Sequence, residues 1–185
     1  MKYRQMKEQD LFRFAQDIKS CYDSCHLVFD DQNPLKGLST EGLLLFLKDY
    51  IEADDSSITA ILDDDEKFLY GIIIFDNIRM GVKNSAQVHI VNDRSIWGHR
   101  IKDIYKQVIH CSIFDILYAE IPAIAVGAIG MCRRLGFKKT GYIPSIAPYT
   151  NSKGEEKVYD IQIWSLIKWW TTTLLYGNIW EQTYQ

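Results

Sequence analysis

The order of hydrophobic and polar positions along the chain predicts that helices alternate with short strands. Between Glu8 and Cys25, apolar side chains recur every three or four residues after a short first strand in "KYRQM". The same spacing returns in "LSTEGLLLFLKDYIE", where Ser39 or Thr40 can serve as the N-cap. Both segments are therefore expected to be amphipathic helices.

Strand-like patterns dominate the middle of the chain. Three runs rich in β-branched and aromatic residues are bounded by turn residues: "SITAIL", "FLYGIIIFDNI" and "SAQVHIV". The acidic segment "DDDEK" joins the first two runs as in a hairpin, and we interpret it as a solvated turn rather than a metal site. A helix over 96–114 is expected next, because its apolar residues form one stripe: Ile101, Ile104, Tyr105, Val108 and Ile109.

A strand, a helix and a late strand complete the expected domain, in "LYAEIP", "AVGAIGMCRRLG" and "KVYDIQIWSL". Gly136 stands where the helix should end, since glycine readily adopts the left-handed conformation that closes a helix. Phe137 can then return to the core. The order of elements, β, α, α, β, β, β, α, β, α, β, β, indicates an α+β fold with one central sheet.

The composition is that of a globular domain. Of the 185 residues, 47% are hydrophobic, which is enough for one packed core. The formal net charge is -3, so no overall basic field is present to attract nucleic acid or an anionic membrane. The four cysteines are scattered, and no apolar run has the length of a signal peptide or a membrane span. We therefore expect a reducing, cytoplasmic location.

The element order and the stretch "MCRRLGFKKTGYIP" together resemble the GCN5-related N-acetyltransferase (GNAT) superfamily, in which a helix ends in Leu-Gly-Phe before a turn and a strand. The resemblance covers residues 1–166 and includes a degenerate loop before the 101–114 helix. It implies a mixed, mainly antiparallel sheet of about six to seven strands with helices on both faces. It also implies acetyl-CoA-dependent transfer to an amine. The chain looks similar, too, to acetyltransferase-like proteins encoded by tailed bacteriophages.

The resemblance implies a cofactor site at the start of the 101–114 helix. In the family, a loop of the form Arg/Gln-x-x-Gly-x-Gly/Ala meets the pyrophosphate of acetyl-CoA with backbone amides and the helix dipole. The corresponding stretch here, "VNDRSIWGHRIKD", keeps one glycine and carries bulky side chains where the pattern has small ones; an ordinary capped helix start is the alternative. The residues expected to bind the cofactor are Ile90, Val91, Asn92, Arg94, Trp97, Gly98, His99, Arg100 and Arg133.

Three side chains are candidates for proton transfer under the resemblance. His89, on the opposite strand face from its neighbours, and Glu120, at the end of the next strand, are the candidate bases. Cys132 stands where the family commonly has a tyrosine acid, and Val126 replaces the usual asparagine. A structural histidine and a buried apolar cysteine are the alternative interpretations.

Two functions fit these observations. One is an N-acetyltransferase acting on an unidentified amine, borne by a small molecule or a protein. The other is a catalytically inactive GNAT-fold binding or assembly protein that acts through an aromatic C-terminal extension, 167–185. This extension either packs on the domain or forms a surface for a homodimer or protein partner. Neither a metal ion, nor a membrane, nor nucleic acid is expected as a ligand.

Overall fold

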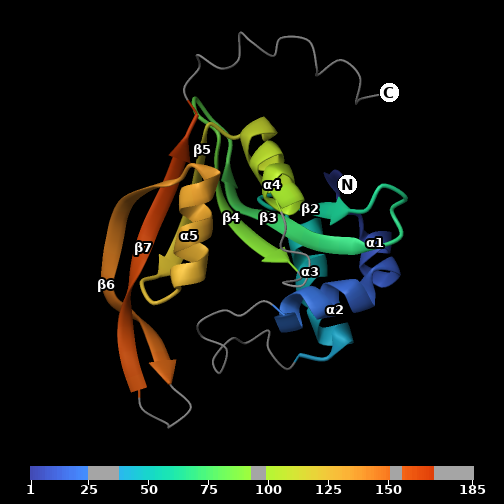
Figure 1. Cartoon of the computed structure of the whole chain (residues 1–185), viewed down its shortest axis with the longest axis horizontal. Helices are drawn as coiled ribbons and strands as arrows, with labels where there is room; N and C mark the ends of the chain where they lie inside the picture. The colour runs from blue at the N-terminus through green and yellow to red at the C-terminus, as the bar shows by residue number, and fades with distance from the viewer. Residues whose placement is uncertain (25–37, 93–98, 151–155, 169–185) are drawn as a thin grey trace.

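A computed structural model describes residues 1–24, 38–92, 99–150 and 156–168 (Figure 1). The described residues form one seven-stranded sheet in the order β1-β2-β3-β4-β5-β7-β6. Its strands are β1 (Lys2–Gln5), β2 (Ser57–Leu62), β3 (Leu69–Arg79), β4 (Ser85–Asn92), β5 (Ile116–Pro122), β6 (Lys138–Thr150) and β7 (Glu156–Ile167). The helices are α1 (Glu8–Arg13), α2 (Ala15–Ser24), α3 (Thr40–Glu52), α4 (His99–Cys111) and α5 (Val126–Leu135). Among the described helices, none combines the length and the apolar character needed to cross a membrane.

Each face of the sheet carries its own hydrophobic core. Helices α4 and α5 cover one face, and α1, α2 and α3 cover the other (Figure 1). Along β3, Ile73 and Phe75 join the core of α4 and α5, whereas Ile72 and Ile74 join the core of the N-terminal helices. This alternation follows because successive side chains of a strand point to opposite faces. Only β4 and β5 pair in parallel, so the expected mixed, mainly antiparallel sheet with helices on both faces is confirmed.

The N-terminal helical segment is divided, although the sequence predicts one continuous helix over 8–25. Helix α1 ends at Arg13, and Phe14 leaves the helical conformation with φ -107° and ψ 21° before α2 begins. The ring of Phe14 is buried in the same core as Leu11 and Ile18, beneath the guanidinium of Arg13 at 4.8 Å. The apolar spacing therefore survives the break, which is why periodicity alone did not reveal it.

Two helix ends confirm the sequence-based expectations. The Ser39 hydroxyl accepts a 3.1 Å hydrogen bond from the Gly42 backbone, so Ser39 is the N-cap of α3. At the end of α5, Gly136 has φ +94°, and the Phe137 backbone donates to the Cys132 carbonyl at 2.9 Å. These are the features of a Schellman ending, and Phe137 returns to the core as expected.

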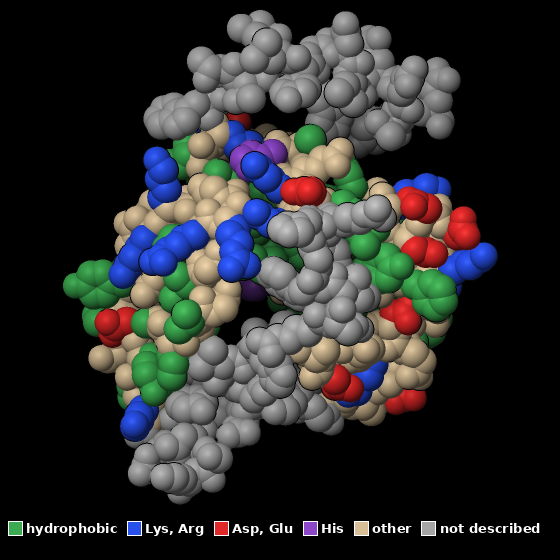
Figure 2. Space-filling view, viewed as in Figure 1, with side chains coloured by type: hydrophobic (Ala, Val, Ile, Leu, Met, Phe, Trp, Pro, Cys, Tyr) green, Lys and Arg blue, Asp and Glu red, His purple; other side chains and the backbone are tan. Residues whose placement is uncertain are grey.

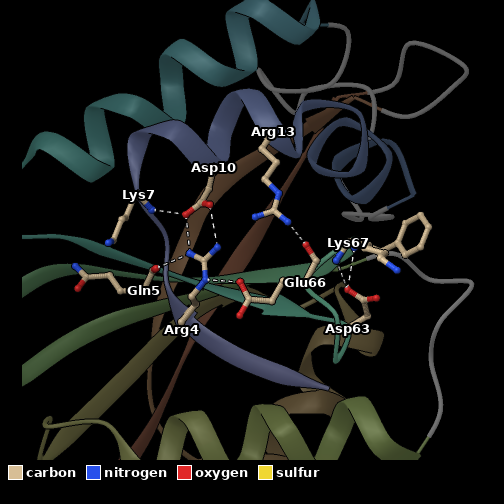
Figure 3. A network of polar contacts seen from close by, with 9 residues as sticks. Arg4, Gln5, Lys7, Asp10, Arg13, Asp63, Glu66 and Lys67 are labelled. Carbon is tan, nitrogen blue, oxygen red and sulfur yellow. Dashed lines mark hydrogen bonds and ion pairs between the residues drawn. The ribbon is translucent and has the colours of Figure 1, made fainter. Parts of the chain in front are cut away.

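A network of charged side chains fastens the first strand to the first helix (Figure 3). The guanidinium of Arg4 donates to the two carboxylate oxygens of Asp10 at 2.7 and 2.9 Å, and its Nε donates to Glu66 at 3.1 Å. The Lys7 backbone also donates to Asp10, at 2.8 Å. Hydrogen bonding from Arg4 lowers the pKa of Asp10, whose side chain is only 3% exposed. β1, α1 and the β2–β3 turn are thereby joined.

Candidate active site

The two parallel strands at the centre of the sheet diverge. β4 and β5 pair only from Ser85 with Ile116 to Gln87 with Tyr118. Beyond these positions the described residues of the two strands form no further pairs, and the strands separate (Figure 1). Within the described residues, the second half of β4 therefore has no strand partner on its β5 side. Backbone groups in this situation can bind an extended ligand in place of a strand.

Residues expected to contact the pantetheine lie on this part of β4. Ile90 and Val91 pair with β3 on one side, and their side chains pack against the two opposite cores. A ligand between the strands would therefore meet mainly their backbone. Asn92 is buried, and its carbonyl accepts a 3.5 Å hydrogen bond from Ser24 of α2. This placement fits a backbone role for residues 90–92, which stays a prediction.

A glycine behind the opening allows α4 to approach the sheet closely. A Cβ at Gly71 would lie 2.5 Å from the Tyr105 hydroxyl and 2.8 Å from the Val91 carbonyl oxygen. Tyr105 belongs to α4 and is buried, so its ring occupies the space that a larger residue on β3 would need. Gly71 therefore helps to fix α4 relative to the end of β4. No pattern in the sequence indicates this role of Gly71.

The expected pyrophosphate loop lies largely outside the described residues. β4 ends at Asn92 and α4 begins at His99. The segment between them, with Arg94, Trp97 and Gly98, is not among the residues that the structure describes, nor are the side chains of His99 and Arg100. Their expected contacts with acetyl-CoA stay predictions.

On the face covered by α3, His89 lies beside a carboxylate. Its Nε2 is 3.4 Å from Oδ2 of Asp76, a residue of β3. Asp76 pairs directly with Gln87, so His89 is its diagonal neighbour on the same sheet face. The imidazole side chain is 42% exposed, but its Nε2 is enclosed and receives no hydrogen bond from the described residues. One ring nitrogen is thus covered by the carboxylate while the ring remains accessible.

Two tyrosines adjoin the same carboxylate. Burial, followed by the charge and hydrogen bonding of Asp76, raises the pKa of Tyr50 on α3. Burial, followed by the charges of Glu120 and Asp76, raises the pKa of Tyr118 on β5. Both phenols are therefore neutral at physiological pH. Part of this region lines a concavity of about 300 Å³, formed by Asp49, Tyr50, Ala53, Asp55, Ser56, Asp76 and Asn77.

No model of a protein family matches the chain, and no curated protein matches its sequence. The solved structures most similar to it include several acetyltransferases. A point mutant of the spermidine N-acetyltransferase SpeG from Vibrio cholerae has a TM-score of 0.65 and 13% identity, over 96% of this chain and 99% of that one. The ribosomal-protein-alanine N-acetyltransferase from Brucella melitensis has a TM-score of 0.63 and 16% identity, over 90% and 99%. RimL, a ribosomal L7/L12 α-N-protein acetyltransferase in complex with coenzyme A, has a TM-score of 0.67 and 15% identity, over 90% and 93%. This protein has the GNAT fold.

The remaining candidates for proton transfer lie on both faces of the GNAT sheet. Glu120 is exposed on β5, on the same face as Tyr118 and His89. Cys132 is on the other face, within the core formed by α4 and α5, where burial raises the pKa of its thiol to about 12. It is therefore a neutral thiol at physiological pH. The catalytic roles given to these residues stay predictions.

Basic side chains gather at the end of α5 in this GNAT fold. Arg133 and Arg134 form its last turn, and Lys138 and Lys139 begin the following strand; all are exposed. The guanidinium of Arg133 lies 5.4 Å from the Trp164 ring, close enough for a cation–π contact. Figure 2 shows a hollow near the middle of this view, with Lys and Arg side chains along one side of it. The end of α5 lies beside the end of α4, where His110 Nε2 is 3.4 Å from the Leu135 carbonyl, and not beside the start of α4; the cofactor contact expected of Arg133 stays a prediction.

Proposed function

We propose that the protein is an acetyl-CoA-dependent N-acetyltransferase. The observation that carries this proposal is the divergence of β4 from β5, which leaves the backbone of residues 90–92 without a strand partner on the β5 side. When bound, acetyl-CoA supplies an activated acetyl thioester. The chain would hold its pantetheine through the backbone of Ile90, Val91 and Asn92. Its phosphates would lie toward the start of α4, where free backbone amides and the helix dipole favour anions. Arg133 stays a candidate contact on the strength of the sequence alone.

The residues present fit such a cofactor. An extended pantetheine can hydrogen-bond to a strand edge as a peptide does. The Gly71–Tyr105 contact holds α4 close to this strand, so the start of the helix follows directly on the strand edge. The similarity to RimL, whose structure contains coenzyme A, supports the same assignment.

The acceptor amine would approach from the opposite side, over α3. His89 is our first candidate for the base that removes a proton from the amine, because its ring is exposed on that side. Glu120 is the second candidate. Asp49, Asp55 and Asp76 give the region negative charge, which favours the approach of an ammonium group. The neighbours act on spermidine and on ribosomal proteins, and we propose an amine of either kind, small or protein-borne, as acceptor.

Proton delivery to the departing thiol is the least defined step. Cys132 lies on the inward side of α5, the helix whose last turn carries Arg133 and Arg134. We retain it as the candidate acid because a neutral thiol can donate a proton. Of the three features that favoured an inactive binding protein, Trp97 and the aromatic C-terminal extension lie outside the described residues, apart from Ile167 and Lys168. The third, Cys132 in place of the tyrosine common in the family, is a buried thiol.

Calorimetric titration with acetyl-CoA tests the proposal directly. We expect a dissociation constant on the order of micromolar. Lys102→Gln, in the first turn of α4, should weaken binding about tenfold through loss of a cation near the phosphates, whereas Arg134→Gln, an exposed arginine beside the other end of α4, serves as the control. Absence of any binding heat at millimolar acetyl-CoA would rule out the enzyme. If binding is found, mass spectrometry of amines incubated with protein and acetyl-CoA should detect acetylated product.

A further inference from the structure

We propose that Asp76 and Tyr50 are positioning residues for His89. In this arrangement Asp76 keeps the imidazole in the tautomer protonated on Nε2, so that Nδ1 carries the lone pair, and Tyr50 fixes the carboxylate of Asp76. The catalytic meaning of the arrangement rests on the proposed function. The tautomer itself does not, since it is a property of the protein alone.

The chemistry of the two facing atoms determines where the imidazole carries its proton. A neutral imidazole has one N–H donor and one nitrogen lone pair, whereas an ionised carboxylate only accepts hydrogen bonds. The nitrogen of His89 that faces Asp76 is Nε2, at 3.4 Å from Oδ2, and it is enclosed. A lone pair directed at a carboxylate in an enclosed place would be repelled. The proton is therefore expected on Nε2.

The contact between these two atoms is long. At 3.4 Å it is longer than an ordinary hydrogen bond, and Nε2 makes no hydrogen bond within the described part of the chain. Contacts between catalytic groups are often long before a ligand binds and shorten in the complex. A small rotation of the exposed imidazole would bring Nε2 into hydrogen-bond distance. His89 and Asp76 are therefore placed so that a small movement would form the hydrogen bond between them.

The side chain of Asp76 is supported from α3. Burial, followed by the charge and hydrogen bonding of Asp76, raises the pKa of Tyr50, so its phenol lies near this carboxylate. The ring of Tyr50 packs edge-to-face against Phe46, with centroids 5.1 Å apart. The Tyr50 carbonyl in turn accepts a hydrogen bond from the Ser56 hydroxyl. These contacts hold both the ring and the backbone of Tyr50. The Asp76 side chain is only 17% exposed, so its carboxylate has little freedom to turn away from His89.

Nitrogen-15 NMR of histidine-labelled protein tests the proposal without any substrate. Two-bond proton–nitrogen correlations distinguish the two imidazole tautomers, and His89→Gln assigns the signal of His89. At about pH 8.5 we expect the spectrum of the wild-type ring to show the tautomer with its proton on Nε2, which faces Asp76. In Asp76→Asn the amide can donate as well as accept, so the fraction protonated on Nδ1 should rise severalfold. Tyr50→Phe should cause a smaller shift in the same direction.

Asp49→Asn is the matched control, because it removes an exposed carboxylate from the same concavity. It should leave the His89 tautomer unchanged. Circular dichroism and thermal melting establish that each variant is folded. A wild-type His89 protonated on Nδ1, or an Asp76→Asn spectrum identical to that of the wild type, would overturn the proposal.

Kinetics then separate this proposal from the proposed function. If the protein transfers acetyl groups, Asp76→Asn should lower kcat about tenfold to a hundredfold, because general-base catalysis typically contributes at least that much. The KM for acetyl-CoA should stay unchanged, and Asp76→Glu should restore part of kcat. An Nε2-protonated His89 in a protein without acetyl-CoA binding would refute the enzyme and leave the positioning geometry intact. Full transfer activity in Asp76→Asn would refute the positioning role alone.

Discussion

Two carboxylates in contact with a cation or an imidazole are held very differently in this protein. Asp10, beside the sheet edge, receives two hydrogen bonds from Arg4 and one from the Lys7 backbone, all between 2.7 and 2.9 Å (Figure 3). Asp76, at the centre of the sheet, lies 3.4 Å from His89 Nε2 without a hydrogen bond to it. The carboxylate of Asp10 thus accepts three short hydrogen bonds, whereas the carboxylate of Asp76 could still accept a hydrogen bond from His89.

This difference distinguishes a carboxylate that stabilises the fold, Asp10, from one that we propose for a role in catalysis, Asp76. A buried charge is tolerated when its partners and hydrogen bonds are complete, as they are at Asp10. A half-exposed imidazole beside an incompletely engaged carboxylate gains less for the fold. It can, however, form new contacts when a ligand arrives.

Removing Arg4 should cause the largest loss of stability. In Arg4→Met the buried Asp10 loses the guanidinium that makes two of its hydrogen bonds, so the free energy of unfolding should fall by about 2–4 kcal/mol. Urea denaturation measures the change. Lys19→Met is the control: Lys19 forms an i,i+4 ion pair with Asp23 on α2, and its loss should cost less than about 0.5 kcal/mol. Equal effects of the two substitutions would contradict the structural role of the Arg4 network.

Adding a methyl group at Gly71 should disturb the tightly packed backing of the candidate cofactor site. In Gly71→Ala the new Cβ would meet the Tyr105 hydroxyl and the Val91 carbonyl, and overpacking of this kind costs about 1–3 kcal/mol. Because β4 must shift, acetyl-CoA binding should weaken as well. Thermal melting and calorimetry measure the two effects.

Gly130→Ala provides the matched comparison for Gly71→Ala. Gly130 lies inside α5, and a Cβ there would meet nothing within 4 Å. Alanine is favoured over glycine in helices, so this variant should gain about 0.5–1 kcal/mol. A destabilised Gly130→Ala together with a neutral Gly71→Ala would show that the close approach of α4 to β4 is not as tight as described.

The sequence predicted much of the fold because its signals are local. The Leu135-Gly136-Phe137 ending can be recognised from three neighbouring residues, because a glycine that adopts φ +94° permits the helix to end there. The uninterrupted apolar run from Ile72 to Phe75 in β3 likewise indicates a strand that is covered on both faces. The break at Phe14 was missed because it leaves the spacing of buried residues unchanged.

The candidate site was predicted less completely because it depends on strand register. His89 was recognised from its face on β4, but Asp76 becomes its neighbour only when Asp76 pairs with Gln87 across the sheet. Tyr50 reaches the same carboxylate from a helix 26 positions earlier in the chain. One residue of slip would move each of these side chains to the other face. Such long-range placement leaves no periodic signal in a single sequence.

Acidification should weaken the Arg4 network in a defined direction. Arg4 lowers the pKa of Asp10 below its ordinary value of 3.8, so the pair contributes stability that is complete above about pH 4. This contribution is lost as the pH falls through the lower pKa of the folded state. The stability difference between wild type and Arg4→Met should therefore narrow between pH 6 and about pH 2–3, when urea midpoints are compared. A difference that stays constant over this range would argue against ion pairing as its source.

The same substitution at both carboxylates gives the most direct comparison and the smallest expected effect. Asp10→Asn replaces a carboxylate that accepts two bonds from Arg4 and should cost about 1–3 kcal/mol. Asp76→Asn keeps an oxygen acceptor for Tyr50 and removes one negative charge from a region that also holds Asp49 and Asp55. The lost contact with His89 and the relieved repulsion should nearly offset each other, so the free energy of unfolding should change by less than about 0.5 kcal/mol. If Asp76→Asn proved as destabilising as Asp10→Asn, Asp76 would be a structural carboxylate, and its open contact with His89 would lose its functional meaning.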